Sequence, residues 1–359
     1  MNFINILLII CYFLSIFLYY LKMPVTITFF MACLGIIPLA GLMGKATEEL
    51  AKKRGPVIGG LLNATFGNAT ELIIAFVALR EGYYEVVKAS ITGSIIGNLL
   101  LVLGVSIFAG GLKYKTQKFN KAAVSNSSTL MTIALIGLLV PAVFSHVTKF
   151  TEGSVVVEDL SLCVAVLLLI VYFAGLVFSL HTHKSLFSPV SENCGGDTCE
   201  EEHCKPAWST GKSMTVLLVS TVLVVFASEI LVKSIEGVMH QLHLSQLFVG
   251  VIIIAIIGNA AEHGMAVIMA IKNKTDLAIS IVTNSSTQIA LFVAPVLVLA
   301  GFFIGKHMSL LFNPFEVLAV GLSIVIATMI ASDGESNWFE GVLLLAVYLI
   351  LAVGFYFLK

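Results

Sequence analysis

The feature that most limits the fold is a series of apolar runs, each long enough to cross a lipid bilayer. A transmembrane helix needs about 20 mainly apolar residues to span the hydrocarbon core. Eleven runs meet this requirement: residues 3–21, 25–43, 57–79, 89–109, 122–144, 160–180, 214–231, 247–270, 277–303, 315–331 and 338–358. With 58% hydrophobic and 11% charged residues, the composition excludes a soluble domain. The sequence therefore predicts an all-α integral membrane protein with about 11 transmembrane helices.

The charge of the chain restricts its partners. The formal net charge is −1, and the charged residues that exist lie mainly in short loops. No basic surface indicates nucleic acid, so the expected partner is the lipid bilayer. The first run has no basic stretch before it and no cleavage site after it, so we expect it to remain as a helix. An oligomer is left open.

A single long polar segment, residues 181–212, divides the runs into two groups. Its acids, among them Glu200, Glu201 and Glu202, predict a solvated linker. Cys194, Cys199 and Cys204 lie in the same segment at the loose edge of zinc-site spacing, so metal or redox sensing is an alternative. The predicted organisation is an extra helix at 1–22, a five-helix repeat at 23–181, an acidic linker at 182–212 and a second five-helix repeat at 213–359.

Two short motifs inside apolar runs match between these groups at one offset. They are Gly67-Asn68-Ala69-Thr70-Glu71 and Gly258-Asn259-Ala260-Ala261-Glu262. A carboxylate near the bilayer midplane costs several kcal/mol, so an acid there is by default a functional hypothesis. Gly and Asn are poor helix formers, so we expect both helices to be weakened beside the acids. Five is odd, so the repeats have opposite orientations, as in secondary transporters whose site lies between two halves.

The next helix in each half carries further oxygen donors. We align Ser94 and Asn98 with Asn284 and Gln288, a shift of one residue relative to the motifs. Two carboxylates with amide and hydroxyl oxygens, and no thiolate, suit a hard cation, and Ca²⁺ accepts 6 to 8 oxygens in flexible geometry. The predicted Ca²⁺ ligands are Glu71, Glu262, Asn68, Asn259, Asn98 and Gln288. Supporting positions are Gly67, Gly258, Ser94, Asn284, Ser285 and His263, although His263 points roughly 100° away from Glu262 on a helix.

The same two carboxylates can bind protons. Two glutamates about 5 Å apart repel by roughly 3 kcal/mol at an effective dielectric near 20, which favours protonation when no cation is bound. Competition between Ca²⁺ and protons for one pair of acids is the minimum that an antiporter requires. The transported ions are Ca²⁺ and H⁺, and no cofactor is expected.

Plainer interpretations exist for each of these residues. The acids can be buried and hydrogen-bonded, the glycines can allow close helix packing, and Asn98 and Gln288 can join helices. Three acids lie near helix ends, namely Glu48, Glu49 and Glu229. They either serve cations or protons at the two entrances or form ordinary surface ion pairs. A cation channel lined by acids is a weaker alternative. An enzyme based on Glu262 and His263 is weaker still, because the His-Glu-x-x-His spacing is missing.

Lys and Arg in the loops predict the orientation. With alternating helices, most of them fall on the side that holds the amino terminus, including Lys52, Lys53, Arg54 and the four lysines of residues 113–121. Positive residues favour the cytoplasmic side. The amino terminus and the linker are therefore expected in the cytoplasm, and the carboxy terminus outside.

These motifs, with Gly93 to Asn98 and Ser285 to Phe292, resemble the signature repeats of the calcium/proton antiporters, the cation exchanger (CAX) branch of the calcium/cation antiporter superfamily. The resemblance covers almost the whole chain and implies Ca²⁺ export in exchange for H⁺ by alternating access. It also implies a location in a prokaryotic cell membrane. It implies Glu71 and Glu262 as shared sites. The sodium/calcium branch usually has an Asp where this chain has Gln288, which disfavours the alternative of Na⁺- or K⁺-coupled exchange.

Overall fold

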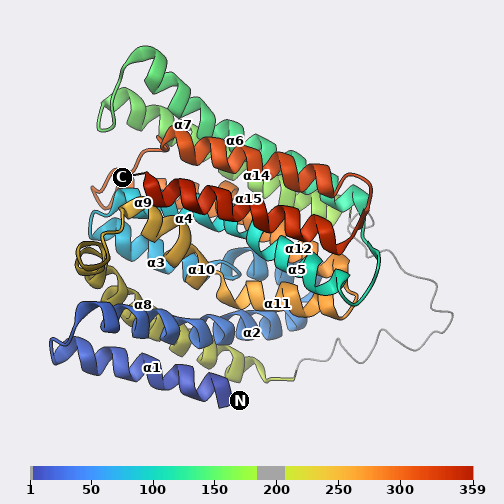
Figure 1. The fold of residues 1–359 in the computed structure, drawn as a ribbon, viewed down its shortest axis with the longest axis horizontal. Coiled ribbons are helices and arrows are strands. Elements are labelled where there is room, and N and C mark those ends of the chain that lie inside the picture. Colours follow the sequence, from blue (N-terminus) through green and yellow to red (C-terminus); the bar gives the residue numbers. More distant parts are fainter. Residues whose placement is uncertain (1–2, 184–206, 359) are drawn as a thin grey trace.

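The computed structural model describes residues 3–183 and 207–358 as helices packed side by side, with their axes mostly along the long dimension of the molecule (Figure 1). The prediction of a helical membrane protein is confirmed. The first half contains α1 (Phe3–Tyr20), α2 (Val25–Phe66), α3 (Ala69–Arg80), α4 (Tyr84–Ile96), the π-helical segment η1 (Gly97–Val102), α5 (Leu103–Gly111), β1 (Gln117–Lys118), α6 (Lys121–Thr148), α7 (Val155–Val177) and the π-helical η2 (Phe178–Thr182).

The second half lies within residues 207–358. It contains α8 (Thr210–Leu242), α9 (Gln246–Phe248), the π-helical η4 (Val249–Ile254), α10 (Ala255–Gly258), α11 (Ala260–Ile271), α12 (Thr275–Gln288), the π-helical η5 (Ile289–Val293), α13 (Ala294–Phe303), α14 (Pro314–Ile330), β2 (Glu335–Ser336) and α15 (Trp338–Phe357). The strands β1 and β2 pair antiparallel and were not expected from the sequence. Among the described residues, seven helices are long and apolar enough to span a bilayer, or eight if the bent pair Gln246–Gly258 and Ala260–Ile271 counts as one span. The number eleven stays a prediction.

Helical structure joins the first two predicted runs of the first repeat. The run 25–43 and the first part of the run 57–79 fall on α2, and a Glu48–Lys52 ion pair of 2.8 Å, four residues apart, supports the helix between them. The helical path nevertheless bends sharply between Ala51 and Gly59. A Cβ added at Gly59 would lie 2.6 Å from the carbonyl oxygen of Ala51, whereas eight residues of a straight helix span about 12 Å. The predicted break is real and lies at Gly67 and Asn68, between α2 and α3.

The matching break in the second half is a bend of 62° at Asn259, between α10 and α11. The helices that follow the two breaks run toward opposite membrane faces. The end of α11 meets the connection after α5, since Gln117 Nε2 donates to Ala270 O at 3.2 Å, whereas α3 ends at the connection before α4. Because α4, η1 and α5 form one continuous span, those two connections lie at opposite ends of it.

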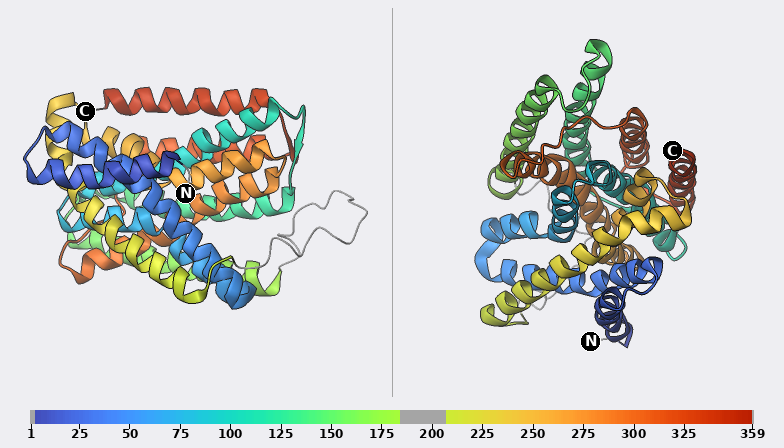
Figure 2. Two further views of the ribbon diagram at one scale, coloured as in Figure 1. Left: turned by 90° about the horizontal axis from the view of Figure 1, so that it is seen from below. Right: turned by 90° about the vertical axis from the view of Figure 1, so that its left-hand side faces the viewer.

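Two membrane faces can thus be distinguished. We call the face at which α7 ends and α8 begins the linker face, and the other the opposite face. The first part of α2 packs extensively against α8, and both cross the remaining helices obliquely (Figure 2, left). A hydrogen bond of 2.9 Å from Trp208 N to the Glu49 carboxylate fixes the start of α8 to α2 at the linker face.

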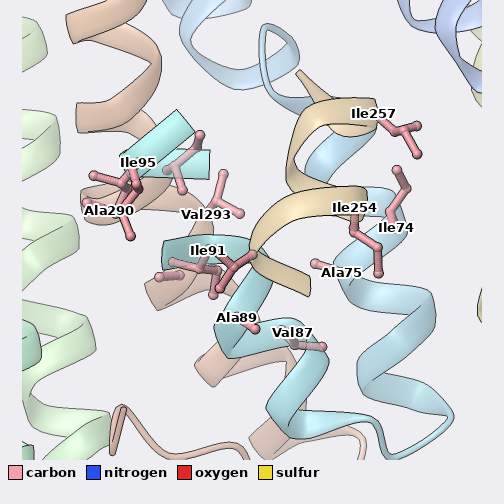
Figure 3. Close-up of a cluster of buried hydrophobic side chains, with 14 of the residues drawn as sticks. Ile74, Ala75, Val87, Ala89, Ile91, Ile95, Ile254, Ile257, Ala290 and Val293 are labelled. Carbon is pink, nitrogen blue, oxygen red and sulfur yellow. The ribbon is translucent and has the colours of Figure 1, made fainter. Parts of the chain in front are cut away.

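The apolar core lies around the crossing of α4 with η4. Figure 3 shows Ile74, Ile91, Ile254 and Val293 from four different elements gathered in one cluster. This cluster lies on the side of the two breaks that faces the opposite membrane face. It borders the polar residues described next.

Candidate functional site

Two asparagines at the helix breaks form the centre of a polar cluster in the membrane interior. Asn68 precedes α3 and Asn259 precedes α11, and their exposed fractions are 2% and 0%. Asn259 Nδ2 donates to Ser94 Oγ at 2.8 Å, and Ser285 Oγ donates to Asn68 Oδ1 at 3.0 Å. Each asparagine therefore bonds to a serine in the other half, and the cluster joins both halves.

This pairing corrects one part of the sequence alignment. At the offset that relates Asn68 to Asn259, the counterpart of Ser94 is Ser285, not Asn284. The sequence separation between Asn98 and Gln288 does differ from that offset by one residue, as the alignment had it. This one-residue difference between the amide positions arises in the π-helical segments, in which each turn takes up an extra residue. Asn98 lies inside η1, whereas Gln288 lies just before η5, so the π turn begins one position earlier in the first half.

The remaining amides complete a continuous chain of hydrogen bonds. Asn68 Nδ2 donates to Gln288 Oε1 at 2.6 Å, and Asn98 Nδ2 donates to Ser285 Oγ at 3.0 Å. His263 Nε2 lies 3.1 Å from Asn98 Oδ1. His263 thus turns toward the cluster through Asn98, although its position on the helix suggested that it points away from the acid.

Three buried oxygens in this cluster have no hydrogen-bond partner within residues 3–183 and 207–358. They are Glu71 Oε2, Glu262 Oε2 and Asn259 Oδ1. The Glu71 and Glu262 carboxylates are close enough to interact electrostatically. An unpaired buried carboxylate costs several kcal/mol, so such oxygens need a proton or a cation.

Glycines let the two halves approach at these positions. A Cβ added at Gly258 would lie 3.1 Å from Glu71 Cγ. One added at Gly67 would lie in ordinary contact with Gln288 Oε1 at 3.5 Å, and its tightest contact would be with the carbonyl oxygen of Asn63 at 2.6 Å. In both cases the glycine faces a polar side chain of the other half. The close approach therefore serves the polar cluster as well as helix packing.

Two cavities meet the cluster, and they differ greatly in size. A cavity of about 260 Å³ reaches Gln288 from the linker face. On the other side, a space of about 10 Å³ borders Glu71 and Ser94, which is room for roughly one water. Ile74, Ile91, Ile254 and Val293 line this small space (Figure 3). The cavity at the linker face thus reaches the cluster at Gln288, whereas the space beside Glu71 on the other side holds roughly one water.

The other candidate residues lie apart from the cluster. Asn284 is exposed and lines the larger cavity. Glu48 pairs with Lys52, and Glu49 accepts from Trp208 N. Glu229 forms an ion pair of 3.0 Å with Arg80. Each of these three acids therefore has a basic or backbone partner.

The predicted linker falls largely outside the described residues. Cys194, Cys199, Cys204 and the acids Glu200 to Glu202 belong to that part. Helix α8 begins at Thr210, so the last three positions of the range 182–212 assigned to the linker are helical. Within the described ranges, no three His, Cys, Asp or Glu side chains gather as a metal-binding group, so the oxygens around Glu71 and Glu262 are mostly amide and hydroxyl.

Sequence comparison identifies the family. The profile of the family described as sodium/calcium exchanger protein matches residues 24–181 and 212–357. The chain is a member of this exchanger family. The exchanger is 49% identical over 340 residues to a protein of Synechocystis sp. named Ca(2+)/H(+) antiporter, covering 92% of this chain and 91% of the other.

Two further proteins are similar over nearly their whole lengths. The Ca(2+)/H(+) antiporter of Aphanothece halophytica is 48% identical over 335 residues, with 92% of this chain and 90% of that protein covered. The solved structure of native YfkE superposes on the exchanger with a TM-score of 0.85 at 40% identity, and covers 99% of this chain and all of the other. The family resemblance predicted from the motifs is therefore confirmed, and the exchanger is a multi-pass membrane protein.

Proposed function

We propose that this exchanger is a secondary active antiporter that exports Ca²⁺ in exchange for H⁺. The observation that carries the proposal is the set of three buried, unpartnered oxygens on Glu71, Asn259 and Glu262. Two negative charges and a neutral oxygen meet there, and the ligands that Ca²⁺ prefers are carboxylate and amide oxygens. Asn68, Asn98 and Gln288 complete the proposed ligand set, each by rotating an amide that now bonds to a neighbour.

Protons occupy the same carboxylates in the other half of the cycle. When Ca²⁺ leaves, Glu71 and Glu262 face each other in a water-poor interior, and protonation removes both the repulsion and the cost of burying charge. Each occupant excludes the other because they use the same oxygens. This exclusion couples the two fluxes.

The relatives support this assignment of the ions. The two curated relatives, each about half identical to this chain over nine tenths of its length, are named Ca(2+)/H(+) antiporters. Na⁺- or K⁺-coupled exchange is the alternative suggested by the family name, and Gln288 disfavours it because an amide supplies no further charge for monovalent cations. A transporter also accounts for the cluster better than an enzyme or a channel, because one side of it is closed.

The orientation follows from the loop charges. We place the amino terminus and the linker face in the cytoplasm of a prokaryotic cell and the carboxy terminus outside. The organisation into an extra helix at 1–22, repeats at 23–181 and 213–359 and a linker at 182–212 belongs to the same proposal. The larger cavity then opens to the cytoplasm, so the structure corresponds to the state that loads Ca²⁺.

The proposal is tested by ⁴⁵Ca²⁺ uptake into inside-out vesicles. A pH jump that makes the interior acidic should drive uptake in the absence of Na⁺ and K⁺. Two protons per Ca²⁺ supply about 2.7 kcal/mol for each pH unit, which supports a roughly hundredfold Ca²⁺ gradient. Uptake that requires Na⁺ or K⁺, or that collapses no pH gradient, would refute proton coupling.

A further inference from the structure

The cavity at the linker face is lined by polar but uncharged side chains. It has a volume of about 260 Å³ and lies between α2, α6, α7 and α12. Asn63, Asn126 and Asn284 contribute amides, Ser127 and Thr287 contribute hydroxyls, and no Asp, Glu, Lys, Arg or His side chain is among its lining residues. A polar cavity at this depth in a membrane protein holds water.

Three of the lining amides are free to bind. In the part of the chain that the structure describes, the side chains of Asn63, Asn126 and Asn284 make no hydrogen bond to the protein. Asparagine is unfavourable in an apolar helix, and such residues in membranes normally bond to a neighbouring helix. These three come from three different helices and meet around one space. Their amide groups therefore face the contents of the cavity.

The cavity has room for a hydrated cation. On the measure by which one water needs about 10–15 Å³, six to eight waters around Ca²⁺ need roughly 60–120 Å³, which is less than the volume of the cavity. The cavity also leads directly to the cluster, since Gln288 lines it and accepts a hydrogen bond of 2.6 Å from Asn68. A cation in the cavity thus already borders Gln288, one of the proposed ligands.

We propose that Asn63, Asn126 and Asn284 form a staging site for hydrated Ca²⁺. Their amide oxygens accept hydrogen bonds from the waters around the ion, which keeps its hydration shell until it reaches Gln288. The absence of charge in the lining keeps this binding weak, and weak binding lets an ion move onward instead of being trapped. The inference rests on the proposed Ca²⁺ transport and adds a second, neutral subsite to it.

The test compares the two membrane faces in the double variant Asn126→Leu with Asn284→Leu. Leucine branches at the same carbon as asparagine and cannot bond to water, so we expect the KM for Ca²⁺ at the cytoplasmic face to rise about three- to tenfold, the effect of losing one or two hydrogen bonds. The KM for Ca²⁺ at the opposite face, measured in right-side-out vesicles, should stay unchanged. Leu176→Val, which alters an apolar lining residue of the same cavity, is the matched control and should change neither value.

A second variant keeps the test informative if the double variant fails to fold. Asn284→Asp adds a charge at an exposed position, and it should lower the cytoplasmic KM while slowing maximal exchange, because the ion leaves the subsite less readily. Equal changes of KM at both faces, or none in either variant, would overturn the staging site while leaving Ca²⁺/H⁺ exchange intact. Wild-type vesicles without any pH-driven ⁴⁵Ca²⁺ uptake would overturn the proposed function and the staging site together.

Discussion

The close crossing of α4 and η4 makes a sharp prediction about two glycines on one helix. A Cβ added at Gly93 would lie 2.2 Å from the carbonyl oxygen and 2.4 Å from the Cα of Val251. Both atoms are backbone, so no side chain can rotate to make room. Ordinary contact begins near 3.4 Å, so Gly93→Ala must push the two helices apart by about 1 Å.

This displacement acts directly on the polar cluster. Ser94 follows Gly93, and its hydroxyl accepts from Asn259 Nδ2 at 2.8 Å. A shift of about 1 Å lengthens that contact to almost 4 Å, beyond hydrogen-bonding distance. Overpacking of this kind costs about 1–3 kcal/mol of stability. Misplacement of reacting groups by 1 Å can cost about a hundredfold in rate, and we expect a loss of that order in exchange.

The matched control is Gly97→Ala, one turn further along. A Cβ at Gly97 meets no atom within 4 Å. This variant should exchange Ca²⁺ like the wild type and have equal or slightly higher thermal stability, because alanine favours a helix over glycine by roughly 0.5–1 kcal/mol. Both variants are measured by pH-driven ⁴⁵Ca²⁺ uptake and by thermal unfolding in detergent. Equal activity of Gly93→Ala and Gly97→Ala would show that the close crossing does not position the cluster.

Three other predictions follow from single contacts. Glu71→Gln and Glu262→Gln should each abolish exchange in the vesicle assay, since each half supplies one of the two charges; full exchange by either variant would disprove the shared site. His263→Ala should weaken Ca²⁺ binding about fivefold with folding intact, because one hydrogen bond to the cluster is lost. An unchanged Ca²⁺ affinity in a binding titration would show that the His263 ring does not orient Asn98. Glu316→Ala should cost about 2–3 kcal/mol of stability and Glu340→Ala about 1 kcal/mol. Both glutamates close capping boxes, but Glu316 is fully buried and also accepts from Thr92 at 2.8 Å. Thermal unfolding that ranks the two variants equally would contradict the role of burial.

The sequence was sufficient for the helical class and for the pairing of the two motifs. Glu71 and Glu262 stand out because an acid in an apolar run is costly, and the breaks at Asn68 and Asn259 follow from poor helix formers beside them. Both depend only on local composition and on repetition along the chain. The structure confirms the helical membrane class and places the four residues in one cluster.

Other features depend on geometry that no local pattern contains. The π turn starts at different positions in the two halves. Aligning the amides Asn98 and Gln288 therefore hid the equivalence of Ser94 and Ser285. The bend near Gly59 lies within α2, which joins the run 25–43 to the first part of the run 57–79. Asn63 and Asn126 carried a signal, an amide within a helix of the membrane domain, but only the folded chain brings them to one cavity.

The most direct test of the central claim is the number of protons released when Ca²⁺ binds. Purified protein in weakly buffered solution is titrated with Ca²⁺, and the released protons are counted at a series of pH values. We predict release of one to two protons for each Ca²⁺, a Ca²⁺ affinity that falls as the pH is lowered, and about one proton fewer in Glu262→Gln. Binding of Ca²⁺ without proton release across roughly pH 5 to 8 would contradict a site shared by the two ions.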